Sequence, residues 1–350
     1  MNTPPRDLAL LPKAHLHLHL EGSMRPGTLA DLATAAGVPA PDVRRYTTFA
    51  EFGARYTAAV DLVRTEAQLR RVMREVVEDA AADGAVWVEP SVNPRAHRDR
   101  LGPPAYVLDL LLDEARTTAD RLGVGCGLMV TAQRHLPPED AVALALLAAS
   151  RAKAGVVAFG LATDEARYPP GPFARAFAIA REAGLISAPH AGELAGEASI
   201  LGAVRDLGAD RIGHGVRAVD SPGLMAELAA RGTVLDVCPT SNVSLGVVSA
   251  LPDHPLPRLI EAGVRCTLGA DDSLLFGAGL LDEYRSARDV LGLDDARLSD
   301  IARWSLEASG APRGTVADAV GAVGAWLEAP AADSSLNPAE TYGRWPKEAS

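Results

Sequence analysis

The sequence predicts an α/β fold in which eight parallel strands, each followed by a helix, close into a (β/α)8 barrel. Short apolar runs alternate with longer amphipathic runs along most of the 350 residues, which is typical of strands buried between helices. Several apolar runs follow a glycine, as at Gly155 and Gly263, and glycine suits the left-handed position that ends a helix. A doubly wound open sheet is the alternative, but it predicts a Gly-rich phosphate loop after the first strand, and residues 16–23 do not form one.

The predicted strands and helices follow one another in regular order. Eight segments have the length and apolar character of barrel strands: residues 14–19, 85–90, 124–130, 155–161, 185–190, 211–214, 233–238 and 265–270. Apolar residues at helical spacing fill the gaps between them, at residues 66–82, 105–120, 138–153, 172–182, 199–207, 221–230 and 256–261.

Two parts of the chain depart from this simple alternation. The connection at residues 23–84 is too long for one crossover helix, and it predicts helices at 26–36, 49–60 and 66–82, with the extra ones over the barrel mouth. Three more helices are predicted after the eighth strand, at residues 280–291, 298–308 and 315–327. We therefore expect a single domain over residues 1–328 and a poorly ordered tail at 329–350, which is rich in Ala, Pro and Ser.

The composition restricts the partners and the compartment. A formal net charge of −11 argues against a non-specific grip on nucleic acid and suits a small polar substrate. The three cysteines match neither a zinc ribbon nor a paired disulfide framework, and we expect them to be buried and reduced: Cys126, Cys238 and Cys266. The sequence shows no secretory signal, and no apolar stretch approaches the ~20 residues that span a bilayer. These features predict a cytoplasmic protein that binds no membrane.

His17 and His19 form a His-x-His pair in the first predicted strand. A strand repeats every two residues, so both side chains lie on one face. At the end of a barrel strand that face points into the mouth, where two imidazoles can ligate one metal ion. A polar strand face satisfied by hydrogen bonds explains the pair equally well when it is taken alone. His15 extends the alternation one pleat deeper, and we assign it a supporting or structural role.

Titratable residues also stand at the ends of three further predicted strands. His190 ends the fifth strand, His214 ends the sixth, and Asp271 and Asp272 follow the eighth. Barrel enzymes assemble their chemistry from the carboxyl ends of several strands, so this joint arrangement predicts an active site.

From these strand ends we predict one metal-binding set and its neighbours. Three imidazoles and one carboxylate would leave a net positive centre with room for a water molecule, which suits one divalent ion of the Zn²⁺ type; the set is His17, His19, His190 and Asp271. Glu193 lies close enough to His190 to serve as a general acid, and His214 can orient or deprotonate the water. Asp272 can form a hydrogen bond with a substrate.

Five short motifs, in the same order along the chain, resemble those of the adenosine deaminase family within the amidohydrolases. The first is PKAHLHLHLEG at residues 12–22, and the later ones are HAGE at 190–193, RIGHG at 211–215, CPTSN at 238–242 and LGADD at 268–272. Each motif alone is weak, but five in order at predicted strand ends form a specific pattern that runs from about residue 11 to about residue 291.

The resemblance implies a barrel of the metal-dependent hydrolase type and a role for each matching residue. The zinc ligands of the family match His17, His19, His190 and Asp271. Glu193 matches the residue that protonates purine N1 while hydroxide attacks C6, His214 matches the histidine beside the attacking water, and Asp272 matches the aspartate that contacts N7. The implied reaction is the zinc-dependent hydrolysis of a 6-aminopurine nucleoside to the 6-oxo nucleoside and ammonia.

Departures from the family pattern concern the substrate. Residues 160–165 read GLATDE where the family commonly has DLAGDE, so Gly160 and Thr163 are expected to reshape the pocket wall. Glu21 stands where many members have an aspartate near the ribose, and one added methylene moves a carboxylate by about 1 Å, which matters in a positioned site. Glu89-Pro90-Ser91 lacks an arginine that is often found there, and His15 replaces a common glutamate.

These departures predict an adenosine-like substrate with a modified or enlarged 5′ group. Together with residues 22–26, they resemble the actinobacterial branch that acts on 6-amino-6-deoxyfutalosine, an intermediate of the alternative menaquinone route. Two other functions stay open. An amidohydrolase acting on adenine or a cyclic amide would have a pocket that does not extend to a sugar. A non-catalytic binding protein would be expected to have lost a ligand or the acid.

Overall fold

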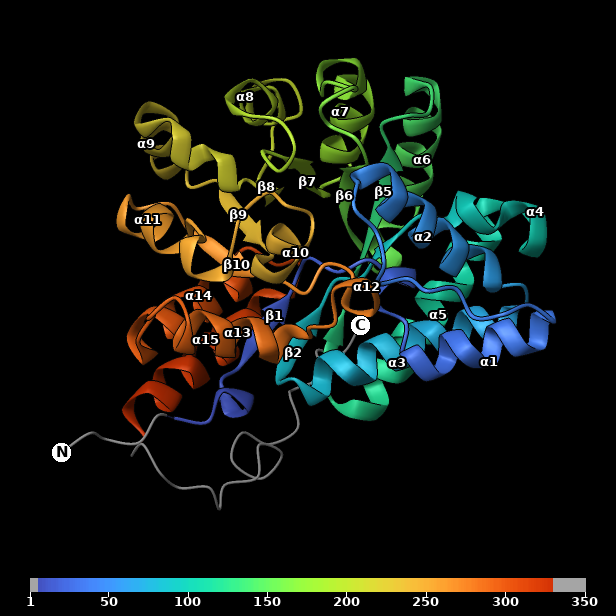
Figure 1. Ribbon diagram of the computed structural model, residues 1–350, viewed down its shortest axis with the longest axis horizontal. Coiled ribbons are helices and arrows are strands. Elements are labelled where there is room, and N and C mark those ends of the chain that lie inside the picture. Colours follow the sequence, from blue (N-terminus) through green and yellow to red (C-terminus); the bar gives the residue numbers. More distant parts are fainter. Residues whose placement is uncertain (1–5, 330–350) are drawn as a thin grey trace.

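The computed structural model describes residues 6–329 as a closed parallel barrel surrounded by helices (Figure 1). The expected disorder of residues 329–350 concerns, from residue 330 onward, a segment outside the described residues. Every strand pairing within the sheets is parallel, in the orders β1-β2-β4 and β10-β9-β8-β7-β6-β5-β3. The strands are β1 (Lys13–His15), β2 (Ala85–Val88), β3 (Ser91–Val92), β4 (Gly125–Cys126), β5 (Leu128–Gln133), β6 (Val156–Ala162), β7 (Ile186–Ala191), β8 (Arg211–His214), β9 (Val234–Val237) and β10 (Cys266–Leu268).

Residues just beyond β1 close the barrel by joining its first and last strands. The N–H of His19 donates to the carbonyl of Asp271 over 2.9 Å, and the N–H of Asp271 donates to the carbonyl of His17 over 3.0 Å. On the other side, the N–H of Ser91 donates to the carbonyl of Leu18 over 2.8 Å. The (β/α)8 fold class that the sequence predicts is therefore confirmed.

Two of the eight staves of the barrel are each split in two. The segment predicted at 85–90 contains only β2, and the same stave resumes as β3 beyond Pro90, which has no N–H to donate to a neighbouring strand. The segment predicted at 124–130 divides into β4 and β5 at Gly127, where an added Cβ would lie 2.7 Å from Val157 and 3.0 Å from Trp87. Because β2 with β3 and β4 with β5 each form one barrel stave, the ten assigned strands make eight staves.

The first predicted strand, at residues 14–19, is longer than the regular strand observed. β1 ends at His15, and beyond it only single bridges form, Leu18 with Asp271 and His19 with Ser91. The backbone is crowded here, because a Cβ on Gly269 would lie 2.6 Å from the carbonyl oxygen of His17. Residues 17–20 form backbone hydrogen bonds with Asp271 on one side and Ser91 on the other, and His17 and His19 lie beyond the regular strand.

Helices surround the strands and in part follow the predicted ranges. They are α1 (Pro26–Ala36), α2 (Phe49–Leu62), α3 (Glu66–Ala82), α4 (Arg98–Leu101), α5 (Pro104–Leu122), α6 (Pro138–Ser150), α7 (Ala174–Glu182), α8 (Glu197–Arg205), α9 (Pro222–Arg231), α10 (Pro239–Ser244), α11 (Leu256–Glu261), α12 (Ser273–Phe276), α13 (Leu280–Asp289), α14 (Asp295–Glu307) and α15 (Arg313–Glu328). The predicted ranges omit three short helices of four to six residues each, α4, α10 and α12.

Helix α3 shows how local sequence signals set an element in place. Thr65 and Gln68 form a reciprocal capping box at its start, which satisfies N–H groups that the helix leaves unpaired. Its apolar stripe is buried, including Leu69, Val72 and Val76, and it packs on β2 and α5. Helix α3 is therefore the crossover between the first two staves, and α1 and α2 are the additional helices of the insertion.

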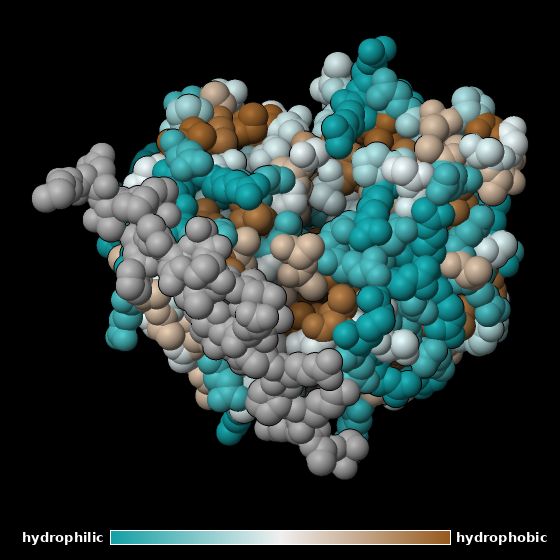
Figure 2. Space-filling model, turned by 90° about the horizontal axis from the view of Figure 1, so that it is seen from below, coloured by the Kyte–Doolittle hydropathy of each residue, from teal (hydrophilic) through white to brown (hydrophobic). Residues whose placement is uncertain are grey.

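The surface gives little sign of an apolar docking face. Among the described residues, the exposed large hydrophobic side chains are Val38, Tyr106, Leu146 and Val290. On the side shown in Figure 2, apolar side chains form small separate groups between hydrophilic ones. No helix in residues 6–329 combines the length and the apolar character needed to cross a membrane.

We predict that Gly269→Ala destabilises the protein, because the new methyl group would meet the backbone of His17, which cannot move aside as a flexible side chain can. Overpacking of this kind typically costs about 1–3 kcal/mol of unfolding free energy. Gly321→Ala is the matched control, since Gly321 lies within α15 and nothing stands within 4 Å of its added Cβ. The control should be stabilising by up to about 1 kcal/mol. Thermal unfolding measures both, and an unchanged Tm for Gly269→Ala would contradict the close approach.

Candidate active site

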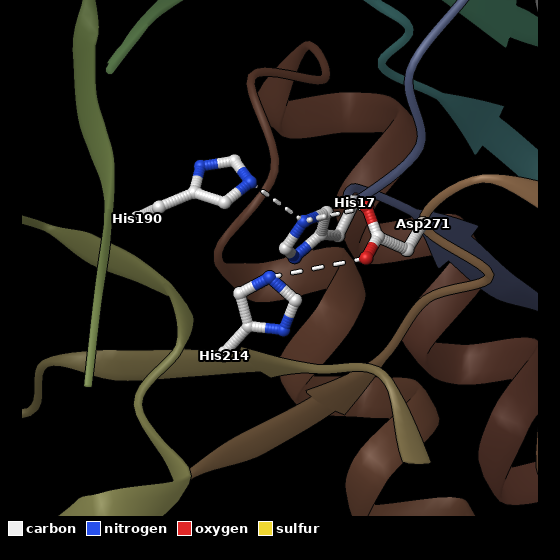
Figure 3. A group of neighbouring side chains, drawn as sticks. All are labelled: His17, His190, His214 and Asp271. Atoms are coloured by element: carbon white, nitrogen blue, oxygen red, sulfur yellow. Dashed lines mark hydrogen bonds and ion pairs between the residues drawn. The ribbon is translucent and has the colours of Figure 1, made fainter. Parts of the chain in front are cut away.

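Four buried side chains from different staves meet at the mouth of the barrel (Figure 3). The ligand atoms of His17, His190, His214 and Asp271 all lie within 4.8 Å of one another. His17 Nε2 is 3.1 Å from His190 Nε2 and 3.5 Å from the Oδ1 atom of Asp271. Three imidazoles and a carboxylate converging in this way form a donor set that suits a divalent transition-metal ion.

His19 lies beside the same group. Its Nε2 atom is 3.3 Å from His190 Nε2 and 3.3 Å from Asp271 Oδ1. The structure thus brings together the four residues predicted as metal ligands. It also places His214 next to them, with its Nε2 atom 3.9 Å from Asp271 Oδ2 and 3.6 Å from Glu193 Oε1.

Hydrogen bonds behind the imidazoles indicate which nitrogen of each ring is available. His17 Nδ1 is 2.9 Å from the backbone carbonyl of Asp236 and must donate to it, so the lone pair of the Nε2 atom faces the cluster. Asn242 Nδ2 donates to His214 Nδ1 over 3.2 Å, and the Oδ1 atom of the same amide accepts from His254 Nε2 over 3.1 Å. Neutral His214 therefore carries its hydrogen on Nε2, which points toward Glu193 and Asp271.

Several supporting residues were not assigned a role from the sequence. Ser241 donates its hydroxyl to Asp271 Oδ2 over 2.6 Å, and Arg134 donates to the carbonyl of His190 over 2.5 Å. Ser241 and Asn242 lie in the CPTSN motif after β9, which the sequence analysis identified. Their roles could not be assigned because their partners are distant in sequence. A polar residue directly after a barrel strand is the signal that could have identified them.

The backbone is strained at three points around the cluster. Among the described residues, the non-glycine residues with positive φ are Thr163 (81°), His214 (66°) and Asp271 (57°). Each follows or ends a barrel strand at the mouth. Such conformations cost of order 1–3 kcal/mol for ordinary residues, most for a β-branched one such as Thr163, and they collect at functional sites.

Burial and neighbouring charges divide the titratable groups into two kinds. Burial alone would raise the pKa of Asp271, but hydrogen bonds with His17 and His19 hold that pKa well below its usual range. Burial, with the charge of His17 as a smaller cause, lowers the pKa of His214 to about 3. Conversely, burial and then the charge of Asp271 raise the pKa of Glu193 well above its ordinary value. Burial thus favours the neutral form of His214 and the protonated form of Glu193, whereas hydrogen bonds favour the ionised form of Asp271.

Asp272 is a second buried acid beside the cluster. Burial, followed by the charge of Asp271, raises the pKa of Asp272 well above its ordinary value. Its Oδ1 atom is buried and has no hydrogen-bond partner among the described residues. Gly22 makes room for it, since a Cβ at Gly22 would lie 1.6 Å from that oxygen. Asp272 is therefore free to bond a ligand.

A cavity of about 490 Å³ opens directly above these groups. Its polar floor includes His19, Glu193 and Asp272, and its wall includes Thr163, so the substituted glycine position borders the cavity. Helix α2 supplies an aromatic side to it with Phe49, Phe52 and Tyr56.

Two residues predicted as substrate contacts are placed elsewhere. Gly160 lies inside the barrel, where an added Cβ would be 2.7 Å from Thr131 Oγ1, and it does not line the cavity. Glu21 is also absent from the cavity wall; its carboxylate accepts hydrogen bonds from His97 over 2.6 Å and from Tyr56 over 3.0 Å. A sequence pattern gives no sign of this, because His97 is 76 residues away.

We predict that Ser241→Ala weakens binding of a divalent cation about 10- to 100-fold, because it removes the hydrogen bond that orients the Asp271 carboxylate. Titration of metal-free protein with Zn²⁺ measures the affinity. Ser249→Ala is the control, since its hydroxyl bonds only the exposed Asp253 in the structure and its affinity should equal that of the wild type. Equal affinities for all three proteins would show that Ser241 does not support the cluster.

Comparison with known proteins agrees with this geometry. The family model described as adenosine deaminase matches residues 12–322. A Streptomyces coelicolor protein named "putative adenosine/adenine deaminase" is 45% identical over 339 residues, covering 93% of this chain and 99% of its own. The solved adenine deaminase of Arthrobacter aurescens superposes with a TM-score of 0.85 at 29% identity, covering 91% of this chain and 99% of its own. A Burkholderia ambifaria amidohydrolase with bound Zn has a TM-score of 0.85 at 26% identity, covering 93% and 94% of the two chains. The chain belongs to the adenosine deaminase family.

Proposed function

We propose that this protein catalyses the metal-dependent hydrolysis of a 6-aminopurine, which yields the 6-oxopurine and ammonia. The observation that carries the proposal is the meeting, in one cavity, of the buried Glu193, whose pKa is raised well above its ordinary value, with the cluster of histidines and Asp271. The reaction needs both an activated water and a proton donor for the ring. The named relatives, an adenosine/adenine deaminase and an adenine deaminase, support the same substrate class.

The metal ligands in this proposal are His17, His19, His190 and Asp271, and the ion is zinc. Two observations support it: His17 directs a lone pair into the cluster, and the related Burkholderia structure holds Zn. When bound, such an ion lowers the pKa of a water molecule toward ~7 and so supplies a nucleophile at neutral pH.

The protein's own groups then orient the reactants and move the proton. Glu193 donates its proton to purine N1, so that the ring gains no net negative charge as C6 becomes tetrahedral. His214, with its hydrogen on Nε2, orients the attacking water by donating to it. Of the two roles considered for His214, this position of the hydrogen favours orienting the water over deprotonating it. Asp272 uses its unpaired carboxyl to bond N7. The amino group then takes up the proton of the new C6 hydroxyl and leaves as ammonia when the C6–N bond breaks, the C6 oxygen becomes the carbonyl, and the other proton of the water restores Glu193.

The substituent on the purine is the finer part of the proposal. The cavity continues past the floor to Asn93, Gln133 and His135, which supports a nucleoside. Free adenine is the second candidate, because the Glu21 carboxylate, the predicted sugar contact, is already satisfied by His97 and Tyr56. The 6-amino-6-deoxyfutalosine branch stays a prediction that rests on sequence motifs alone.

The first test separates the acid from the ligands. We expect Glu193→Gln to keep its bound metal and lose about 10²–10⁴-fold in kcat, because an amide cannot deliver the proton. His17→Ala should instead lose the metal. Metal content by elemental analysis and steady-state kinetics give both results. A near-normal kcat for Glu193→Gln would remove it from the mechanism, and stoichiometric metal in His17→Ala would remove that ligand.

The second test compares kcat/KM for adenosine, 2′-deoxyadenosine, adenine and 6-amino-6-deoxyfutalosine, followed by the loss of purine absorbance. We expect a nucleoside to be preferred; a preference for free adenine would contradict this and select the second candidate. Glu21→Gln adds a control for the sugar contact. If Glu21 only holds Tyr56 and His97 in place, the substitution should lower kcat/KM for adenine and adenosine by the same factor. A loss confined to nucleosides would show direct contact with the sugar.

A further inference from the structure

Glu165 makes an unusual set of hydrogen bonds with the loop that carries Glu193. Glu165 as a whole residue is 4% exposed. The Oε1 atom accepts the N–H groups of Glu193 (2.6 Å), Leu194 (2.5 Å) and Ala195 (3.0 Å). The Oε2 atom accepts the N–H of Gly192 (2.8 Å) and the hydroxyl of Ser199 (2.5 Å). One carboxylate therefore holds four consecutive backbone amides, and hydrogen bonds to an ionised acceptor are among the stronger ones in proteins.

The turn after β6 aims Glu165 at this loop. Thr163 adopts φ of 81°, and the Oδ1 atom of Asp164 accepts the N–H groups of Ala166 (3.1 Å) and Arg167 (3.2 Å). The N–H of Tyr168 donates to the Asp164 carbonyl over 3.2 Å, so Glu165 lies within this turn, and it is buried. Strain of the kind seen at Thr163 persists only where surrounding contacts enforce it, and the five bonds of Glu165 provide such contacts.

The position of Glu193 depends strongly on this backbone. Its Oε1 atom lies 3.6 Å from Nε2 of His214, which is too long for a strong hydrogen bond. Its carbonyl accepts from Arg217 Nε over 2.7 Å, so both Arg217 and Glu165 bond the backbone of Glu193. Because a free carboxyl rotates easily, the place of the acid is set mainly by the backbone that presents it.

We propose that Glu165 is a positioning residue for Glu193, which fixes the Gly192–Ala195 backbone so that the acid faces the substrate. The inference rests on the acid role given to Glu193 under the proposed function. Glu165 itself does not line the cavity. Thr163, which lines the cavity, lies two residues before Glu165. The hydrogen bonds of Glu165 therefore connect this part of the cavity wall to the loop that carries Glu193.

The test is Glu165→Gln, in which an amide nitrogen replaces one acceptor and the charge is lost. We expect faster hydrogen exchange of the amides at residues 192–195 and unchanged metal content. The kcat should fall about 10- to 100-fold, since a displacement of about 1 Å can cost 10² in rate, while KM should change less than about 3-fold. The matched control is Glu75→Gln. Glu75 is also buried and bonds Thr28 and Arg71, none of which lines the cavity, so kcat and the exchange at 192–195 should stay at the wild-type values.

A double mutant distinguishes positioning from a general loss of structure. If Glu165 acts through Glu193, then Glu165→Gln should lower kcat less than about 3-fold in a Glu193→Gln background, because the acid is already gone. Independent, multiplying losses would overturn the proposal, as would unchanged exchange at 192–195 in the single variant. If Glu165→Gln does not fold, Glu165→Asp, which withdraws the carboxylate by one methylene, takes its place with the same readouts. The exchange experiment needs no substrate, so it still shows whether Glu165 fixes the backbone at residues 192–195 if no 6-aminopurine is deaminated.

Discussion

The site depends on the backbone hydrogen bonds that join the first and last staves of the barrel. His19 and Asp271 are 252 residues apart (271 − 19), yet the N–H of His19 donates to the carbonyl of Asp271, and the N–H of Asp271 donates to that of His17. These two bonds bring the two ends of the barrel sequence to within ligand distance. They require a very close approach at Gly269, where even a methyl group would collide with His17. Barrel closure and the convergence of His17, His19 and Asp271 therefore depend on the same backbone contacts.

Beneath the site, a buried ion network connects staves that the cluster uses. Arg211, at the start of β8, pairs with Glu89 over 2.7 Å and with Asp236 over 3.1 Å. Thr267 of β10 also donates to the Asp236 side chain over 2.8 Å, while the Asp236 carbonyl accepts from His17. Buried ion pairs contribute little net stability compared with apolar packing, but removing one partner is costly. The value of this network lies in fixing the staves that orient His17.

Sequence patterns predicted the features that local periodicity determines and missed those that depend on contacts across the fold. The alternation of His17 and His19, the polar strand ends at His190 and His214, and helices α1, α3 and α11 could all be predicted because each signal lies within a few residues. Glu21 was assigned to the substrate, whereas the structure places it between His97 and Tyr56. Glu165, though part of a motif that resembles the family pattern, could not be assigned, because its partners at 192–195 adjoin it only after β6 and β7 pair.

The groups proposed for the chemistry and the groups that surround the rest of the substrate come from different parts of the fold. This difference explains why the reaction class is better defined than the substrate. The groups proposed for the chemistry, such as His190 and Asp271, end staves whose positions are fixed by the barrel. The groups that surround the rest of a substrate come from α2 and from the turn after β6, where side chains can change without disturbing the staves. Glu165 belongs to both groups, because it lies in the turn after β6 and its carboxylate bonds the loop that carries Glu193. A change in the turn that altered specificity would therefore also shift the acid unless these bonds were kept, which restricts how far the turn can vary.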